Sequence, residues 1–150
     1  AQKAAAMNDA ASLISLDTLR ERVLAMPMAQ TLGLRFDALA RGEVTLSAPV
    51  QPGWCFTPGQ LQATALFALA DFAAVAAAAT QLPAGWANGT IDASIKFLAP
   101  ARGQRLRAHG RVVQAGRSLS VCAADVYALD GARETLCATL LGTARNVEAR

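Results

Sequence analysis

The sequence has a single histidine, His109, and only three cysteines, Cys55, Cys122 and Cys137. A metal site built from soft ligands needs a full set of them at regular spacing, and this chain does not supply one. An odd number of widely spaced cysteines also argues against a disulfide framework. We therefore expect no metal site, and a reducing, cytoplasmic compartment.

Aromatic residues are also scarce, at 5% of the chain, and the formal net charge of +3 is spread along the sequence. Nucleic-acid-binding proteins usually show a basic stripe interleaved with aromatic side chains, so we expect no nucleic-acid partner. Hydrophobic residues make up 53% of the chain and charged residues 17%. This balance is typical of a folded protein with a large core.

The longest apolar run, residues 61–80, is an unsuitable membrane span. It is rich in alanine, which is only weakly apolar, and it has Asp71 near its centre. An aspartate in the middle of a span costs roughly 2.5–3.5 kcal/mol on insertion scales. We expect a buried helix and no membrane partner.

A length of 150 residues is typical of one domain. No linker, repeat or block of like charge divides residues 13–150, so we expect them to form a single domain. Residues 1–12 are alanine-rich and polar and lack the apolar core of a signal peptide. We expect them to be a disordered or cloning-derived tail, with Met7 as the natural start.

The spacing of the apolar residues predicts two helices. Apolar residues at helical spacing after Ser15 predict a short amphipathic helix, which Pro27 interrupts. A long helix is expected from Gln60 or Leu61 to Thr80, and it is apolar nearly all round. Such a helix must be covered on most of its sides.

Strands are expected on both sides of the long helix, and the segment Gln51–Pro58 before it is expected to be a loop. The predicted strands are Leu34–Ala40, Glu43–Pro49, Thr90–Leu98, Arg105–Ala115, Ser118–Ala128 and Glu134–Asn146. Short turns join most of them, which indicates an antiparallel sheet. The expected fold class is α+β, with the sheet wrapped around one long central helix.

Asp71 is the only carboxylate between Glu43 and Asp92. A carboxylate buried in such an apolar helix without a partner costs several kcal/mol, and acids in such places are often functional. The alternative is a structural role, in which Asp71 caps a neighbouring backbone or faces a wet interface.

The start of the long helix is a second candidate element. Its first amides have no acceptor within the helix and lie at the positive end of the helix dipole. Asp71 lies two turns further in, about 12 Å along the axis, and Thr64 falls on the same helical stripe. An acyl oxyanion held by these amides can lie within reach of a group that Asp71 activates.

Three segments in this order resemble the PaaI-like acyl-CoA thioesterases. Gly59–Asp71 resembles the helix motif of that family, Gly89–Gly103 the strand and proline loop that follow, and Arg111–Val121 the later hairpin. The resemblance runs from about residue 33 to residue 147. It implies a hot-dog fold, a dimer with a continuous sheet, and a homotetramer built from two dimers. It also implies an acyl-CoA thioesterase that needs no cofactor, because coenzyme A is part of the substrate.

The resemblance also implies roles for individual residues. Asp71 matches the catalytic acid, as general base or nucleophile, and the Ala63 amide matches the oxyanion donor. Thr90 matches a hydroxyl residue that the partner subunit supplies beside the acid. The remaining residues implied for catalysis or for binding of the substrate and its coenzyme A part are Phe56, Gly59, Gln62, Thr64, Gly89, Arg117 and Ser118.

The chain departs from the family pattern at the helix start. Gln62, Ala63 and Thr64 stand where the family has His-Gly-Gly or His-Ala-Gly, and Phe56 stands where it often has a polar residue. A backbone amide survives the change from glycine to alanine, and Gln62 can donate through its side-chain amide.

Two other functions remain open. The first is a non-catalytic hot-dog protein that binds acyl-CoA or acts as an assembly subunit. The second is a hydratase or dehydratase, but that chemistry usually pairs an acid with a histidine, and the long helix has none. His109 is expected on a solvated sheet face and Cys55 as a packed thiol.

Overall fold

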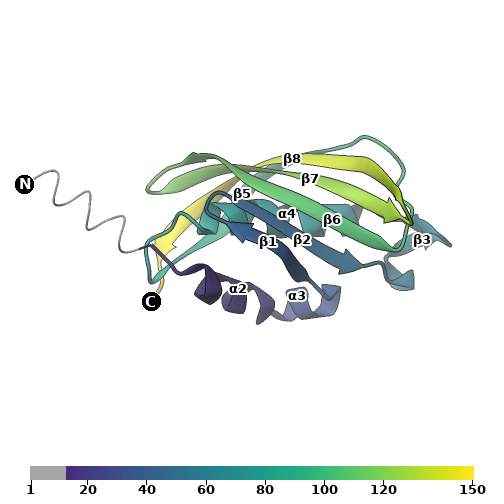
Figure 1. The fold of residues 1–150 in the computed structure, drawn as a ribbon. Helices are drawn as coiled ribbons and strands as arrows, with labels where there is room; N and C mark the ends of the chain where they lie inside the picture. Colours follow the sequence, from purple (N-terminus) through teal and green to yellow (C-terminus); the bar gives the residue numbers. More distant parts are fainter. Residues whose placement is uncertain (1–12) are drawn as a thin grey trace, which may run out of the picture.

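The computed structural model describes residues 13–150, so the expectations for residues 1–12 lie outside the described part of the chain (Figure 1). Within residues 13–150, two helices, α2 and α3, come first, and a single long helix, α4, lies between the early and late strands. The elements in chain order are α2 (Leu16–Leu24), α3 (Pro27–Leu32), β1 (Arg35–Ala40), β2 (Glu43–Pro49), the 3₁₀ turn η1 (Pro52–Trp54), β3 (Cys55–Thr57), β4 (Gln60–Leu61), α4 (Ala63–Ala79), β5 (Trp86–Phe97), β6 (Arg105–Ala115), β7 (Leu119–Asp130) and β8 (Arg133–Glu148).

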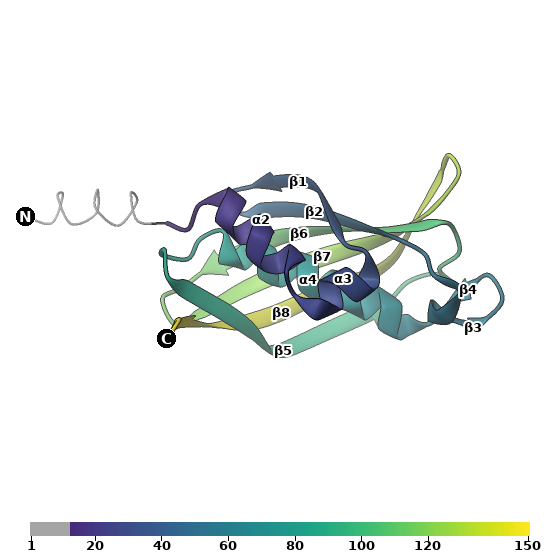
Figure 2. The same ribbon diagram turned by 90° about the horizontal axis from the view of Figure 1, so that it is seen from below.

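The main sheet has six strands in the order β1-β2-β6-β7-β8-β5, and every neighbouring pair is antiparallel. Helix α4 packs against strands β6, β7 and β8. Helices α2 and α3 lie on the side of α4 that faces away from these strands (Figures 1 and 2). The predicted α+β class, with a sheet wrapped around one long helix, is confirmed.

One glycine sets how closely α4 approaches the sheet. A Cβ placed on Gly110, in β6, would lie 2.1 Å from the carbonyl oxygen of Ala73 in α4. Its neighbour Ala108 is fully buried on the same face, whereas His109 points to the outer face and lies opposite Thr45 of β2. Successive side chains of β6 point to opposite faces of the sheet, so small residues lie under the helix and polar residues lie on the outer face.

The C-terminal end of α4 is closed by the turn between β1 and β2. The buried hydroxyl of Thr80 accepts a hydrogen bond from the amide of Gly42 at 2.8 Å. The guanidinium of Arg41 donates to the carbonyl oxygen of Thr80 at 2.5 Å. A cation at this position also complements the negative end of the helix dipole.

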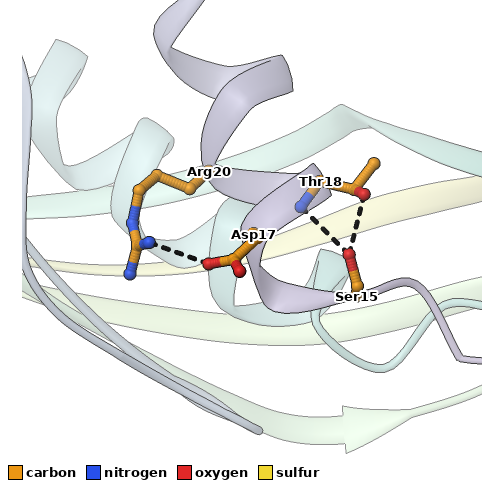
Figure 3. A network of polar contacts seen from close by, with 4 residues as sticks. All are labelled: Ser15, Asp17, Thr18 and Arg20. Carbon is orange, nitrogen blue, oxygen red and sulfur yellow. Dashed lines mark hydrogen bonds and ion pairs between the residues drawn. The ribbon is translucent and has the colours of Figure 1, made fainter.

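Helix α2 begins as the sequence predicts. The side chain of Ser15 accepts a hydrogen bond from the amide of Thr18 at 3.1 Å and donates to its hydroxyl at 2.7 Å (Figure 3). An ion pair of 3.0 Å between Asp17 and Arg20 supports the same turn (Figure 3). Pro27 ends this helical segment as predicted, but it also opens α3, a second short helix that was not predicted.

The boundaries around α4 differ from the prediction. The helix starts at Ala63 rather than at Gln60 or Leu61, because those two residues form β4 and pair with β3. The segment expected as a loop therefore contains a 3₁₀ turn and a short strand. Strand β5 starts at Trp86, four residues before the predicted start, because it pairs with β8 along its whole length.

The sheet leaves one stripe of α4 uncovered in the single chain. This stripe is half-buried or exposed, and Asp71 lies within it. The residues of this stripe are Thr64, Phe67, Ala68, Asp71, Phe72 and Val75. In residues 13–150, no helix is long and apolar enough to span a membrane.

Candidate active site

Asp71 is half-buried on α4 and is not left without a partner. The hydroxyl of Thr90, on β5, donates a hydrogen bond of 2.6 Å to Asp71 Oδ1. The register of β5 against β8 shifts between Thr90 and Asp92, which is the signature of a β-bulge at Ile91. Bulges redirect side chains and are common beside active sites. Thr90 comes from the same chain as Asp71, whereas the resemblance implied that a partner subunit supplies this hydroxyl.

A second polar contact holds β5 against α4. The side-chain amide of Asn88 donates to the carbonyl oxygen of Val75 at 3.1 Å, one helical turn beyond Asp71. Gly89 lies between Asn88 and Thr90, and a Cβ placed on it would meet no atom within 4 Å. The predicted site residues Gly89 and Thr90 therefore lie beside the acid, next to open space.

That space is a cavity of about 270 Å³. Asp71 and Thr90 are among the polar residues that line it, and apolar side chains form most of the remaining wall. The wall comes from α2, α4 and the start of β5. A mostly apolar pocket with a few converging polar groups is the usual form of a small-molecule site.

Cys122 is not a nucleophile. Burial and, to a lesser extent, the negative charge of Asp71 together raise the pKa of Cys122, on β7, to about 11. A thiol with this pKa stays protonated at neutral pH, and the thiolate is the reactive form. His109 lies on the outer face, where its Nδ1 is 3.1 Å from the hydroxyl of Thr45, so it cannot act as a base for groups beside Asp71.

The start of α4 lies in a different place from the acid. Gln62 is the N-cap residue, but its side chain makes no capping hydrogen bond, and the first turn contains no acidic residue. The residues Gln62, Ala63 and Thr64 are exposed. The first amides of the helix are therefore available to an anionic ligand.

The predicted binding residues Phe56 and Gly59 lie still further from Asp71, in the hairpin formed by β3 and β4. This hairpin projects at one end of the molecule (Figure 1). Gly59 has a φ of +77°, which the tight turn requires. The Phe56 side chain is 65% exposed, so it is a large apolar group without cover in the single chain.

Arg117 and Ser118 lie toward the other end of α4, in the exposed turn between β6 and β7. Arg117 lines a surface depression together with Leu82 and Trp86, beyond the cavity that contains Asp71. The carbonyl oxygen of Ser118 accepts a hydrogen bond from the amide of Asn146 at 2.8 Å. A single chain therefore brings together Asp71, Thr90 and Gly89, but not the other predicted site residues.

Several residues that shape the site were not predicted from the sequence. Asn88 and Trp86 line the cavity, but they precede the strand predicted from Thr90. Leu19 and Val23 of α2 also line it, as does Met26 in the link between α2 and α3. The only signal in the sequence was the amphipathic pattern of α2, which shows an apolar face but not its partner.

Comparisons with known proteins agree with this architecture. A sequence profile of the thioesterase superfamily matches residues 63–135, from the start of α4 to the start of β8. A thioesterase family protein from Silicibacter pomeroyi has 30% identity over 87% of this chain and 96% of its own, with a TM-score of 0.84. A search of curated protein sequences finds no significant match.

Two other solved structures share the fold at lower identity. A thioesterase from Haemophilus influenzae has 20% identity over 90% of this chain and 92% of its own, with a TM-score of 0.77. A phenylacetic acid degradation-related protein from Ralstonia eutropha has 23% identity over 85% of this chain and 98% of its own, with a TM-score of 0.74. The profile match and the relative from Silicibacter pomeroyi show that the chain belongs to the thioesterase superfamily, as a thioester hydrolase with the hot-dog fold.

Proposed function

We propose that this protein hydrolyses acyl-CoA thioesters to a free acid and coenzyme A, with Asp71 as the catalytic carboxylate. The observation that carries the proposal is the pair formed by Asp71 and Thr90 at the edge of an apolar cavity. A thioester needs a base or nucleophile at its carbonyl carbon and an apolar space for its acyl group. This part of the site offers both.

The hydrogen bond from Thr90 engages one oxygen of the Asp71 carboxylate. The other oxygen, Oδ2, is then oriented to take a proton from a water molecule that attacks the carbonyl carbon. The tetrahedral intermediate collapses when its C–S bond breaks and coenzyme A leaves as a thiolate. Alternatively, Oδ2 attacks the carbonyl carbon directly, and water hydrolyses the resulting anhydride. Both routes use the same carboxylate and give the same products.

The developing oxyanion requires donors at about 3 Å. We assign this role to the amide of Ala63, with the side chain of Gln62 as a second donor. Ala63 and Asp71 lie on one helix, about 12 Å apart along its axis. One carbonyl group cannot contact both of them, so we propose that Asp71 of one subunit acts with Ala63 of another.

The uncovered surfaces of the single chain support such a dimer. Strand β5 is an edge of the sheet, and large apolar side chains are exposed on it, including Ile91 at 58% and Phe97 at 48%. Long exposed edges readily pair with another chain. The uncovered stripe of α4, which contains Asp71, requires cover as well. We propose that β5 pairs with its copy in a homodimer and that two dimers form the tetramer.

The turn at Arg117 and Ser118 is then the candidate contact for the phosphates of coenzyme A. Arg117 is exposed and bears a full positive charge, which suits a phosphate. In its own chain it lies beyond Trp86, at the far side of the cavity from Asp71. We therefore assign Arg117 to substrate bound at the acid of another subunit.

Mixing two inactive variants tests the shared site. Asp71→Asn removes the acid, and Ala63→Pro removes the amide hydrogen. Proline is well tolerated at the first position of a helix. Gln62, which precedes it, already has the extended backbone that proline requires, with a φ of −72° and a ψ of 146°. Each variant alone should release little coenzyme A thiol from acyl-CoA.

After the two variants are unfolded and refolded together, half of the dimers are mixed. Each mixed dimer has one site with both changes and one site with neither, so about a quarter of the wild-type activity should return. If each chain used its own acid and amide, no activity would return. Refolding each variant alone is the control.

The alternative is a non-catalytic protein that binds acyl-CoA. The observation that favours it is the sequence Gln62-Ala63-Thr64 at the helix start, which departs from the family pattern. Titration calorimetry with acyl-CoA, together with an assay for free thiol, separates the two functions. Binding without thiol release by the wild-type protein would exclude the thioesterase and support the alternative.

A further inference from the structure

We propose that the cavity beside Asp71 is an acyl-chain site that selects straight chains of medium length, of about eight to ten carbons. This inference rests on the proposed function, because the acyl chain enters the cavity only if the thioester lies at Asp71. It adds a substrate class and a role for the N-terminal helix α2, neither of which follows from the catalytic residues.

The cavity has three walls with different origins. Leu19 and Val23 line it from α2, Phe72 and Val75 from α4, and Trp86 from the start of β5. These side chains are apolar apart from the indole nitrogen of the tryptophan. A hydrocarbon chain fits such a wall, whereas the amide groups of the pantetheine arm would lose their hydrogen bonds to water there. The acyl group is therefore the part of the substrate that enters.

Polar contacts between the walls keep the cavity in shape. Arg22 of α2 donates to the carbonyl oxygen of Trp86 at 3.1 Å, so α2 is tied to β5 across the cavity. At the far end, the amide of Ile14 donates to the carbonyl oxygen of Leu82 at 2.9 Å. Both Ile14 and Leu82 are buried and line the cavity there. The chain that precedes α2 therefore closes the end away from the acid.

The dimensions set the expected chain length. The cavity follows α4 from Asp71 to Ala79, a distance of about 12 Å. An extended chain advances roughly 1.2 Å per atom, so about ten atoms span this length. The volume agrees, because a cavity of about 150 Å³ holds a benzene ring, and this one has about 270 Å³. A lone phenyl group would leave much of it empty.

The wild-type protein should show this preference in a series of straight-chain acyl-CoA esters. Each methylene that enters the cavity should raise kcat/KM about fourfold. The rise should continue to about ten carbons and stop when the far end is reached. Phenylacetyl-CoA, as the aryl comparison, should fall well below decanoyl-CoA.

Two substitutions on α4 should shorten the preferred chain by different amounts. Ala79 lies at the far end of the cavity and Ala76 about one turn nearer the acid, and both line it. Ala79→Leu should lower the optimum by about two carbons and Ala76→Leu by about four, because each blocks the cavity at its own depth. The control is Ala38→Leu, the same change at an exposed position of β1, which should leave the chain-length profile unchanged.

The outcomes separate this inference from the proposed function. Hydrolysis at the same rate for all chain lengths, or the same optimum in all three variants, would overturn the inference and leave the thioesterase in place. If the wild-type protein hydrolyses no acyl-CoA, the proposed function fails, and titration calorimetry with acetyl-, hexanoyl- and decanoyl-CoA decides the inference. Affinity that rises with chain length, and falls for decanoyl-CoA in Ala76→Leu, would support it. Equal affinities would overturn it.

Discussion

Replacing Asp71 with asparagine tests the chemistry most directly. The asparagine side chain has nearly the same shape, and its Oδ1 can still accept the hydrogen bond that Thr90 donates at 2.6 Å. What the variant loses is the ability to take a proton or to form an anhydride. A general base contributes roughly 10²–10⁴-fold, so kcat should fall by that factor or more. This corresponds to about 3–5 kcal/mol in the activation free energy.

The stability of this variant should change in the opposite direction from its activity. Asp71 is half-buried between apolar side chains, and a neutral amide costs less to bury than a carboxylate. The melting temperature should therefore stay level or rise slightly. If the carboxylate were structural, its loss would lower the melting temperature, and activity would fall only in proportion to the folded fraction.

The assay is the release of free thiol from decanoyl-CoA, with calorimetric melting of the same samples. Asp125→Asn is a matched control, because it makes the same change on β7 beside His109, on the outer face of the sheet, away from the cavity. This control should keep wild-type kcat/KM. A folded Asp71→Asn variant that also keeps wild-type kcat/KM would refute the mechanism proposed for this site.

Three further predictions concern other parts of the molecule. Thr90→Val should lower kcat about ten- to hundredfold, because it removes a hydrogen bond to a charged group, and Thr90→Ser should restore it; an unchanged kcat in the valine variant would exclude this positioning role. Arg117→Ala should raise KM for acyl-CoA about five- to thirtyfold with little change in kcat, and equal KM values at moderate salt would exclude Arg117 from the phosphate contact. Burial and the nearby charge of Asp71 raise the pKa of Cys122 from 9.0 to about 11, so the unfolded chain loses this proton first as the pH rises. The free energy of unfolding should therefore fall by about 2 kcal/mol more between pH 9 and pH 11 in the wild type than in Cys122→Ala, as denaturant titration measures, and equal slopes would contradict the raised pKa.

Elements with a strong period were predicted well from the sequence. Strands β2 and β6 have the predicted bounds, Glu43–Pro49 and Arg105–Ala115. Their alternation is set by local chemistry, with small or apolar residues under α4 and polar residues outside. The start of α2 at Ser15 was predicted for a similar reason, since a capping side chain acts within one turn.

Features that depend on contacts distant in sequence were not predicted. Gln60 and Leu61 carry no signal against a helix, and only their pairing with β3 makes them a strand. The hydrogen bond from Asn88 to Val75 and the bulge at Ile91 likewise require the folded sheet. The sequence therefore indicated the acid but not the cavity beside it, because three separate elements build that cavity.

The close contact between Gly110 and Ala73 bears on how this enzyme can diverge. Any side chain at Gly110 would displace α4 from the sheet, since even a Cβ would lie 2.1 Å from a backbone oxygen. Asp71 lies two residues from Ala73 on the same helix, so its height above the sheet is constrained on this side. The opposite wall, from α2, rests on side-chain packing that tolerates changes of volume. New substrate ranges should therefore arise by substitutions in α2, while the position of Asp71 relative to the sheet stays the same.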